Sequence, residues 1–333
     1  MNEKRKVSIE DVAQRAGVSI TTVSRVINKV PTVSAKNQAK VEEAIAYFKY
    51  KPDVSAQRLA RGQNNTIGLV MPGYPGIFHS YYAIELIRGV GHACETFRQD
   101  LVFHIANRDN QLSTSSVGGV IFADIIENKQ HVIDAVEAGV PCMVINNIVE
   151  GMDVNYIGVD NVEGGKIAID YLEGLGHKKI AIITGNLQTQ AGKQRCDGAL
   201  EMLKSKGIEI PPEYIIQGDY SRRSARLAAE KLFSLASPPT AVFAASDDMA
   251  LETIAYVVEK GLKVPDDVSV VGFDDNPAAI YGPVALTTIR QPLFQIAEES
   301  VRILNAIVSG KKKGPVRKVV IPELIVRDSC KSL

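Results

Sequence analysis

Apolar residues recur at helical spacing in three short segments near the start of the chain. The positions that fall on one helix face are Ile9, Val12, Ala13 and Ala16 in the first segment, Val23, Val26 and Ile27 in the second, and Val41, Ala44, Ile45 and Phe48 in the third. Ser8, Ser19 and Ser34 stand where the three helices would begin. Asp11 completes a capping box with Ser8, and Gly17 ends the first helix. The pattern predicts three short helices around one small core, with a helix-turn-helix arrangement in the first two.

The second of these helices has a polar outward face. Its outward residues are Ile20, Thr21, Thr22, Ser24, Arg25 and Asn28. Short hydroxyl side chains let a backbone approach a groove closely, isoleucine can contact thymine methyl groups, and Arg or Asn can hydrogen-bond phosphates or base edges. The face therefore favours contact with DNA. The alternative is a helical cap that packs on the rest of the chain and keeps this face in water.

Charge is divided unevenly along a chain whose formal net charge is zero. Residues 1–63 hold 12 Lys and Arg against 6 Asp and Glu, and the remainder holds 26 against 32. A basic head on an acidic body indicates that the head meets a polyanion, although chance clustering on solvated faces gives the same numbers.

From Thr66 onward, short apolar runs alternate with helical patterns. The runs at 67–72, 101–106, 119–123, 142–147, 179–184, 241–246 and 268–275 predict buried parallel strands, and the segments 85–97, 163–176, 194–207, 224–236 and 248–261 predict helices. This alternation is typical of an α/β fold with doubly wound parallel sheets.

One connection in this series is too short. Only ten residues, 108–117, separate two predicted strands, whereas a parallel crossover needs about a dozen or more and usually contains a helix. We therefore predict a thinned first lobe, with no helix of two or more turns inside 108–117.

Composition narrows the class of protein. With 333 residues, 45% apolar and 23% charged, the chain suits two or three ordinary globular domains. No segment reaches about 18 uncharged apolar residues, and no apolar run follows the basic N-terminus, so we expect a cytoplasmic protein without membrane contact. The four cysteines are widely scattered, which suggests neither a disulfide framework nor a zinc site.

Motifs for catalysis are scarce. The chain has no Walker-type P-loop, no H-E-x-x-H and no G-x-S-x-G, and we expect no cofactor and no metal. The sequences "SDD" (246–248) and "FDD" (273–275) place carboxylates just past two strand ends, where open α/β sheets bind ligands. There they can accept hydrogen bonds from ligand hydroxyls. A sugar-acting enzyme with Asp247 and Asp274 as catalytic groups is the alternative.

The first sixty residues carry a family resemblance. The sequence at 7–62, "VSIEDVAQRAGVSITTVSRVINKVPTVSAKNQAKVEEAIAYFKYKPDVSAQRLARG", resembles the DNA-binding headpiece of the LacI/GalR repressors, and the resemblance continues through nearly the whole chain. It implies that Ile20 and Thr21 read bases. The other DNA-binding residues that it implies are Ser8, Ser19, Thr22, Ser24, Arg25, Asn28 and Ser34. The part "DVSAQRLA" resembles the family's hinge helix and adds Ser55, Ala56 and Leu59, with Leu59 inserted into the minor groove.

The rest of the chain resembles the two-lobed, periplasmic-binding-protein-like domain of the same repressors. The resemblance implies a DNA-binding domain at 1–52, a hinge helix and linker at 53–65, and an effector-binding and dimerisation domain at 66–333. Lobe 1 would span about 66–155 plus a C-terminal return, and lobe 2 about 156–285 plus the C-terminal end. The effector-binding residues that it implies are Asn146 (or Asn147), Arg195, Tyr220, Asp247, Asp274 and Gln291. A structural ion pair is the alternative for Arg195 and Asp274, and plain packing is the alternative for Tyr220. Phe78, His79 and Tyr81 are further cleft candidates.

The expected function follows from the resemblance. It implies a transcriptional regulator, a repressor of sugar or carbohydrate utilisation genes, that binds a pseudo-palindromic operator as a homodimer. A small effector, a sugar or a sugar derivative, would bind between the two lobes and change operator affinity. The competing class is a solute-binding module without DNA activity, and the basic headpiece counts against it.

Overall fold

The computed structural model describes residues 7–27, 30, 32–48, 50, 65–73, 77–106, 112–113, 116–125, 128–312 and 314–333. The chain forms two compact units, Met1–Asn64 and Asn65–Leu333, and each is described by itself. The predicted hinge residues Ser55, Ala56 and Leu59, and Asn28 before them, lie outside the described residues.

The N-terminal unit consists of three helices, α1 (Ile9–Ala16), α2 (Ile20–Ile27) and α3 (Ala35–Phe48). Ser8 and Asp11 form the predicted capping box, and Gly17 ends α1 with φ at 63°. A left-handed φ of this kind favours glycine, so the turn between α1 and α2 depends on it. The helix-turn-helix prediction is confirmed.

The predicted apolar faces of these helices meet in one small core. Val12, Val23, Val41 and Ala44 are buried there, at most 1% exposed. The remaining members of the core are Ile9, Ala13, Ala16, Val18, Val26, Ile27, Ile45, Phe48 and Tyr50. Because local helical spacing determined which side chains face inward, the outward face of α2 is left for contact with another molecule.

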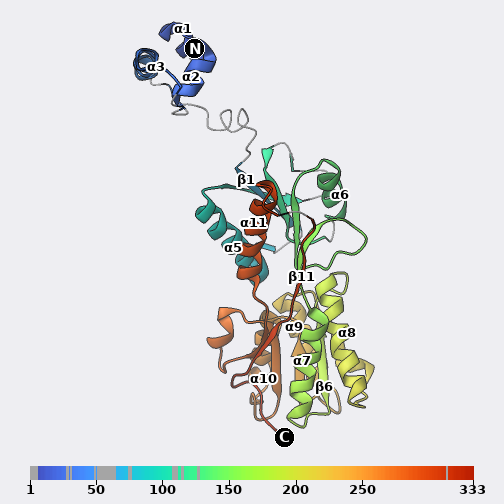
Figure 1. Ribbon diagram of the computed structural model, residues 1–333. Coiled ribbons are helices and arrows are strands. Elements are labelled where there is room, and N and C mark those ends of the chain that lie inside the picture. Colours follow the sequence, from blue (N-terminus) through green and yellow to red (C-terminus); the bar gives the residue numbers. More distant parts are fainter. Residues whose placement is uncertain are drawn as a thin grey trace. The chain divides into compact units, whose positions relative to one another are not determined.

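The larger unit contains two six-stranded sheets, one in each of two lobes (Figure 1). The first sheet contains β1 (Thr66–Pro72), β2 (Asp100–Ala106), β3 (Gly119–Phe122), β4 (Cys142–Ile145), β5 (Asn155–Val159) and β11 (Arg317–Val320). The strand order is β11, β5, β4, β3, β1, β2, and every neighbouring pair is parallel. The first sheet therefore continues through Val159, beyond the lobe boundary expected near residue 155.

The second sheet has the same arrangement with one reversed edge. It contains β6 (Ile180–Thr184), β7 (Ile215–Gln217), β8 (Ala241–Ala244), β9 (Ser269–Asp274), β10 (Thr287–Arg290) and β12 (Glu323–Ile325). The order is β12, β10, β9, β8, β6, β7, and β12 is antiparallel to β10. The parallel α/β class predicted from the alternating pattern is confirmed.

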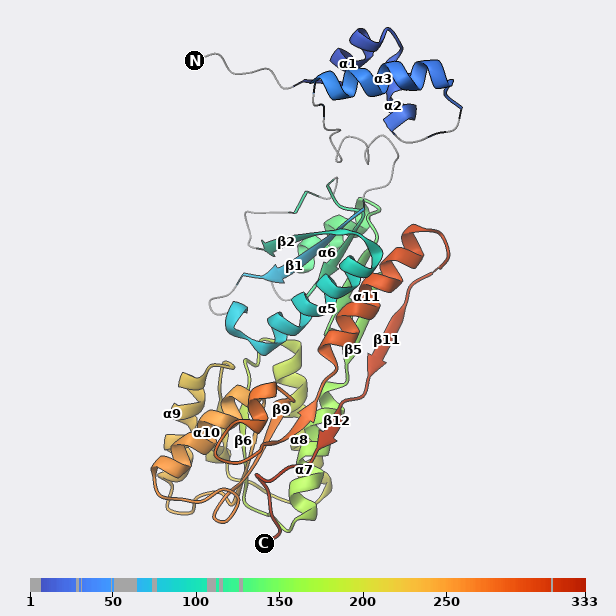
Figure 2. The same ribbon diagram turned by 90° about the vertical axis from the view of Figure 1, so that its left-hand side faces the viewer.

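Helices cover both faces of each sheet. The first sheet packs α5 (Tyr81–Phe97) and α11 (Leu293–Val308) on one face and α6 (Lys129–Glu137) on the other. The second sheet packs α7 (Asn161–Gly174) and α8 (Gln190–Ser205) on one face, and α9 (Arg222–Phe233) and α10 (Asp247–Glu259) on the other (Figure 2). The chain passes between the lobes after β5, after β10 and after β11, so both lobes are built from separate segments.

The strand at 101–106 was predicted to be buried, and this prediction is wrong. It forms β2 at the edge of the first sheet, where Val102 and Phe103 are 37% and 36% exposed. An edge strand is covered by fewer neighbours than a central one, which an apolar run does not reveal.

The short connection at 108–117 is described only at residues 112–113 and 116–117. None of these four residues belongs to an α-helix, and Leu112 and Val117 pack against the core under β3. The other six residues lie outside the described part of the chain, so the thinned lobe stays a prediction.

Candidate functional site

The outward face of α2 is accessible in the N-terminal unit. Ile20 is 46% exposed, Thr21 and Arg25 are also exposed, and Thr22 and Ser24 are half-buried. Ile20 is not part of the small core, and it lies on the same helix face as these polar residues.

The three serines assigned to DNA contact also cap the N-termini of the three helices. Ser8 accepts a hydrogen bond from the backbone of Asp11 at 3.3 Å, and Ser34 accepts one from the backbone of Asn37 at 3.4 Å. Ser19 accepts one from the backbone of Thr22 at 3.2 Å. Each serine is therefore fixed at a helix N-terminus, where backbone N–H groups favour a phosphate.

In the larger unit, Arg195 is the buried cation of the predicted effector cleft. It lies on α8, and its side chain is 4% exposed. Its Nε donates to Asn161 at 2.8 Å and its Nη1 donates to the carbonyl of Ala245 at 2.7 Å. The guanidinium lies over the ring of Phe273, 3.6 Å from the centroid, and 3.6 Å from Asp274. The ion pair offered as the alternative is present, and it holds both charges at one edge of the second sheet.

Asp274 and Gln291 meet beside this cation. Asp274 ends β9, and its carboxylate accepts a hydrogen bond from Nε2 of Gln291 at 2.5 Å. The Oε1 atom of Gln291 is buried and has no hydrogen-bond partner among the described residues. An acceptor in this position is available to a ligand that can donate a hydrogen bond.

Asp247 has a different position from the one expected. It begins α10 and is fully buried, and its two oxygens accept from the backbone of Asn276 at 2.7 Å and from the hydroxyl of Thr288 at 2.5 Å. Burial raises its pKa well above the ordinary value, and the nearby carboxylate of Asp274 adds to the effect. Its contacts hold the loop after β9 in place, so we assign it a positioning role.

The stability of the second lobe should depend on the ionisation of Asp274. Burial raises the pKa of Asp274 from 3.8 to about 6, because Arg195 and Gln291 offset only part of the cost of desolvation. Between these values the folded chain keeps a proton that the unfolded chain has lost. The contribution of this group to stability is therefore present at low pH and is lost as the pH rises through about 6.

We expect the free energy of unfolding of Asp274→Asn, relative to the unaltered chain, to increase between about pH 3.8 and about pH 6 and to change little above that range. Urea unfolding of both proteins at each pH measures the difference, to which the altered titration of the neighbouring Asp247 also contributes. A difference that does not change with pH would show that Asp274 titrates like an exposed aspartate.

Tyr220 lies against the start of α8. Its φ is 71°, and its hydroxyl lies 3.2 Å from the hydroxyl of Thr189. A Cβ atom added at Gly185 would lie 2.2 Å from the ring of Tyr220. The glycine thus makes room for the aromatic ring.

The first lobe contributes two asparagines after β4. Asn146 has a φ of 63° and a buried Oδ1 atom that has no hydrogen-bond partner in the described part of the chain. Asn147 accepts from the backbone of Ile125 at 3.0 Å, and its Nδ2 lies 3.4 Å from Oε1 of Gln190. Gln190 also exchanges two hydrogen bonds with the backbone of Ile148, at 2.8 and 3.0 Å, and so joins the two lobes directly. The sequence pointed to the asparagines and missed Gln190.

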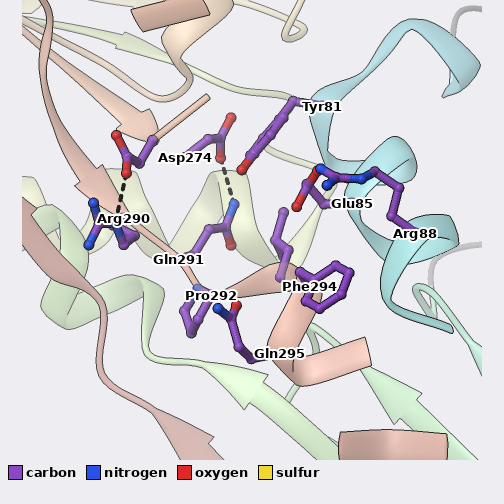
Figure 3. A pocket seen from close by; sticks show the side chains of 11 residues that line it. Tyr81, Glu85, Arg88, Asp274, Arg290, Gln291, Pro292, Phe294 and Gln295 are labelled. Carbon is purple, nitrogen blue, oxygen red and sulfur yellow. Dashed lines mark hydrogen bonds and ion pairs between the residues drawn. The ribbon is translucent and has the colours of Figure 1, made fainter. Parts of the chain in front are cut away.

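A cavity of about 300 Å³ lies between the lobes, next to Asp274 and Gln291 (Figure 3). Tyr81, Glu85 and Arg88 of α5 line it from the first lobe. Its lining from the second lobe and the crossing segment consists of Asp274, Asp275, Arg290, Gln291, Pro292, Leu293, Phe294 and Gln295. Tyr81 was a sequence candidate, whereas Glu85 and Arg88 were missed.

Two other first-lobe candidates have different outcomes. Phe78 is 52% exposed and packs its ring against Phe103, with centroids 5.5 Å apart, so it is not part of the cavity wall. The side chain of His79 is outside the described structure.

Two family models match the chain. Residues 8–53 match the model described as bacterial regulatory proteins, lacI family, and residues 169–330 match a periplasmic binding protein-like domain. A curated relative, the probable HTH-type transcriptional repressor ExuR of Bacillus subtilis (strain 168), is 33% identical over 334 residues. The match covers 98% of this chain and 99% of the relative.

Solved structures resemble the whole chain. The lac repressor dimer bound to operator and the anti-inducer ONPF has a TM-score of 0.81 at 26% identity, with 98% of this chain and all of that chain covered. The transcriptional regulator CelR in complex with cellobiose has a TM-score of 0.71 at 30% identity, with 97% and 99% covered. The helix-turn-helix unit and the two-lobed unit therefore occur together in these proteins as they do here. No helix among the described residues is long and apolar enough to cross a membrane.

Proposed function

The chain belongs to the lacI family of bacterial regulatory proteins, and from that premise we propose a repressor of sugar or carbohydrate utilisation genes that is controlled by a small effector. The chain is a DNA-binding transcriptional regulator rather than an enzyme. The observation that carries the proposal is the exposed face of α2, polar except for Ile20, in a helix-turn-helix unit.

Operator binding is assigned to this face. In our proposal α2 enters the major groove, where Ile20 and Thr21 contact base edges and Thr22, Ser24 and Arg25 contact bases or phosphates. The chain acts as a homodimer on a pseudo-palindromic operator, because two half-sites double the base contacts and the salt-sensitive phosphate contacts of one small unit. The similar lac repressor, which is a dimer bound to operator, supports this arrangement. The proposed set is completed by Ser8, Ser19, Asn28, Ser34, Ser55, Ala56 and Leu59.

The effector is proposed to bind between the lobes, in contact with Asn146, Arg195, Tyr220, Asp274 and Gln291. Buried acceptors on Asn146 and Gln291 support a ligand rich in hydroxyl groups, and the resemblance to a cellobiose complex supports a sugar. Effector binding changes the angle between lobes that Gln190 joins, and this change alters operator affinity. The protein acts in the cytoplasm, where bacterial DNA is found.

Replacing Ile20 or Thr21 with alanine should weaken binding to the operator by at least about 30-fold, because one specific base contact contributes about 1–3 kcal/mol and the dimer loses it in both half-sites. Both side chains are exposed, so the thermal midpoint should not change. Fluorescence anisotropy with an operator fragment and a scrambled fragment measures the affinity and the discrimination. The matched control is Thr96→Ala, the same change at an exposed threonine of α5. Equal discrimination by Thr21→Ala and Thr96→Ala would remove Thr21 from the set of base-reading residues.

Genome-wide immunoprecipitation of the full-length protein, with and without sugars in the growth medium, tests the function as a whole. A few strong palindromic sites beside transport or catabolic genes are the expected result. If the protein binds no specific sites under any condition, it is a solute-binding module instead. If the purified protein converts a sugar, Asp247 and Asp274 are catalytic groups and the protein is a sugar-acting enzyme.

A further inference from the structure

The first-lobe wall of the cavity adds groups that the predicted effector residues do not include. Tyr81, Glu85 and Arg88 stand on successive turns of α5, and Figure 3 shows Tyr81 directed toward Asp274. The cavity shares only Asp274 and Gln291 with the predicted effector-binding set. It therefore continues the proposed effector site into the first lobe.

The negative groups of this cavity are much less exposed than its positive groups, and Glu85 is buried. The side chains of Glu85, Asp274 and Asp275 are 9%, 13% and 13% exposed. Those of Arg88 and Arg290, by contrast, are 61% and 46% exposed. Water and salt screen exposed charges much more than buried ones, so Arg88 offsets the carboxylate of Glu85 less than a buried cation would.

The charges of Asp274 and Asp275 are offset by cations. Asp275 pairs with the exposed Arg290 at 2.7 Å, and two further cations lie behind the wall, the buried Arg195 and the half-buried Arg327. Arg195 is 3.6 Å from Asp274, and Arg327 forms an ion pair with Asp275 at 2.5 Å. Glu85 has its ion pair with the exposed Arg88. A negative potential therefore remains in the part of the cavity that Glu85 lines.

The hydroxyl of Tyr81 responds to this potential. Burial raises the pKa of Tyr81 above its usual range, and the carboxylates of Glu85 and Asp274 raise it further. The potential at the tip of this side chain opposes a second negative charge. It would equally oppose the carboxylate or phosphate of a ligand that entered the cavity.

The hydrogen-bonding groups in the cavity wall favour a ligand that donates a hydrogen bond. The Nε2 atom of Gln291 already donates to Asp274, and its buried Oε1 atom finds no partner among the described residues. Only a group that donates a hydrogen bond can satisfy this atom. Hydroxyl and ammonium groups donate, whereas an ionised carboxylate does not.

The size and the apolar part of the cavity suit a sugar ring. A volume of about 300 Å³ equals the share of about ten waters, which is close to the non-hydrogen atom count of one hexose. Pro292, Leu293 and Phe294 line one part of the cavity and can cover the C–H face of a ring.

We propose that the Tyr81, Glu85 and Gln291 wall selects a neutral or amino-bearing polyol of about one sugar ring and rejects carboxylated and phosphorylated sugars. The inference rests on the proposed function, since it names the class of effector for that same site. Tyr81 and Glu85 are its specificity-determining residues in the first lobe.

Matched sets of sugars test the charge preference. Titration calorimetry of the full-length protein would compare glucose, glucosamine and glucuronate, and then galactose, galactosamine and galacturonate. The neutral or the amino member should bind at least about tenfold more tightly than the uronate, which is about 1.4 kcal/mol. A uronate that binds as tightly as its partners, or the absence of binding by all six sugars, overturns the inference.

Substitutions in the cavity wall test whether its residues determine the charge preference. Glu85→Gln removes the buried charge, so the ratio of the affinities for the amino sugar and the uronate should fall about tenfold or more. Tyr81→Phe should weaken the binding of the neutral sugar with little loss of protein stability. The matched control is Glu298→Gln on α11, whose carboxylate also pairs with an arginine at helical spacing, Arg302, and does not line the cavity. An unchanged gap in Glu85→Gln, in a protein that unfolds at the same temperature, contradicts the assignment.

The same purified protein distinguishes a failure of this inference from a failure of the proposed function. If a uronate binds and changes the affinity for the immunoprecipitated operator, the charge preference fails and the repressor function stands. If no operator site is found, the proposed repressor function is contradicted, whichever sugars bind.

Discussion

The Arg195→Ala variant is expected to bind operator DNA and to lose its response to effector. Arg195 is the buried cation that orients Asp274 and stacks on Phe273, so its removal takes away a group in contact with the proposed ligand. It also leaves Asp274 buried without its counter-charge, which should raise the pKa of that carboxyl further above about 6. Breaking a buried pair in this way costs about 3–5 kcal/mol of stability.

The measurement is operator affinity by anisotropy, with and without the effector identified by calorimetry. Because the alanine variant will unfold at a lower temperature, Arg195→Lys is the second variant. A lysine keeps the charge and loses the planar contacts with Asn161 and Ala245, so it should retain most of the stability and respond to effector only weakly. A full response in both variants would show that the Arg195 and Asp274 pair is structural only.

The Gly198→Ala variant is expected to destabilise the second lobe by roughly 3 kcal/mol, which is a drop of about 5–10 °C in its thermal midpoint. Gly198 lies where α8 crosses α7, and an added Cβ atom would stand 1.9 Å from the carbonyl oxygen of Val162. That oxygen belongs to the backbone of α7, so the two helices must separate. Because Arg195 lies one turn away on α8, effector affinity should fall together with stability.

Gly174→Ala is the matched control for this effect. Gly174 is the last residue of α7, and an added Cβ atom would meet nothing within 4 Å. Alanine at a helical glycine of this kind changes stability by less than about 1 kcal/mol, and usually increases it. Differential scanning calorimetry of the two variants compares the same chemical change in a crowded and in an open position. Equal midpoints would mean that α7 and α8 can move apart at little cost.

The N-terminal unit could be predicted nearly completely, because its information is local. The cap at Ser8, the turn at Gly17 and the inward positions Val12 and Val23 lie within a few residues of one another, and each acts through hydrogen bonds or spacing inside one turn. The outward face of α2 followed from the same periodicity. No contact with a distant part of the chain was needed to orient it.

The larger unit could be predicted only in part. The central strands β5 and β10 were missed together with the edge strands β7, β11 and β12, because these strands are only three to five residues long and include polar or charged residues, which leaves little apolar signal. The helix α11 was missed as well, although it packs against α5 in the core of the first lobe. The helix α11 begins more than 190 residues after α5 ends, so the sequence of either helix does not reveal that the two pack together.

The sequence by itself determined the helix-turn-helix unit, the parallel α/β class and the strand end that carries Asp274, and its resemblance to the LacI/GalR repressors added Arg195 and Gln291. Strand ends and helix starts determine such positions locally, and parallel strands bring them to one edge of a sheet. Only the tertiary structure decided that Asp247 is enclosed, that Gln190 joins the lobes, and that Tyr81 and Glu85 face the cavity from the first lobe. These properties depend on burial and on the meeting of two lobes built from separate segments, and spacing along one segment does not contain that information.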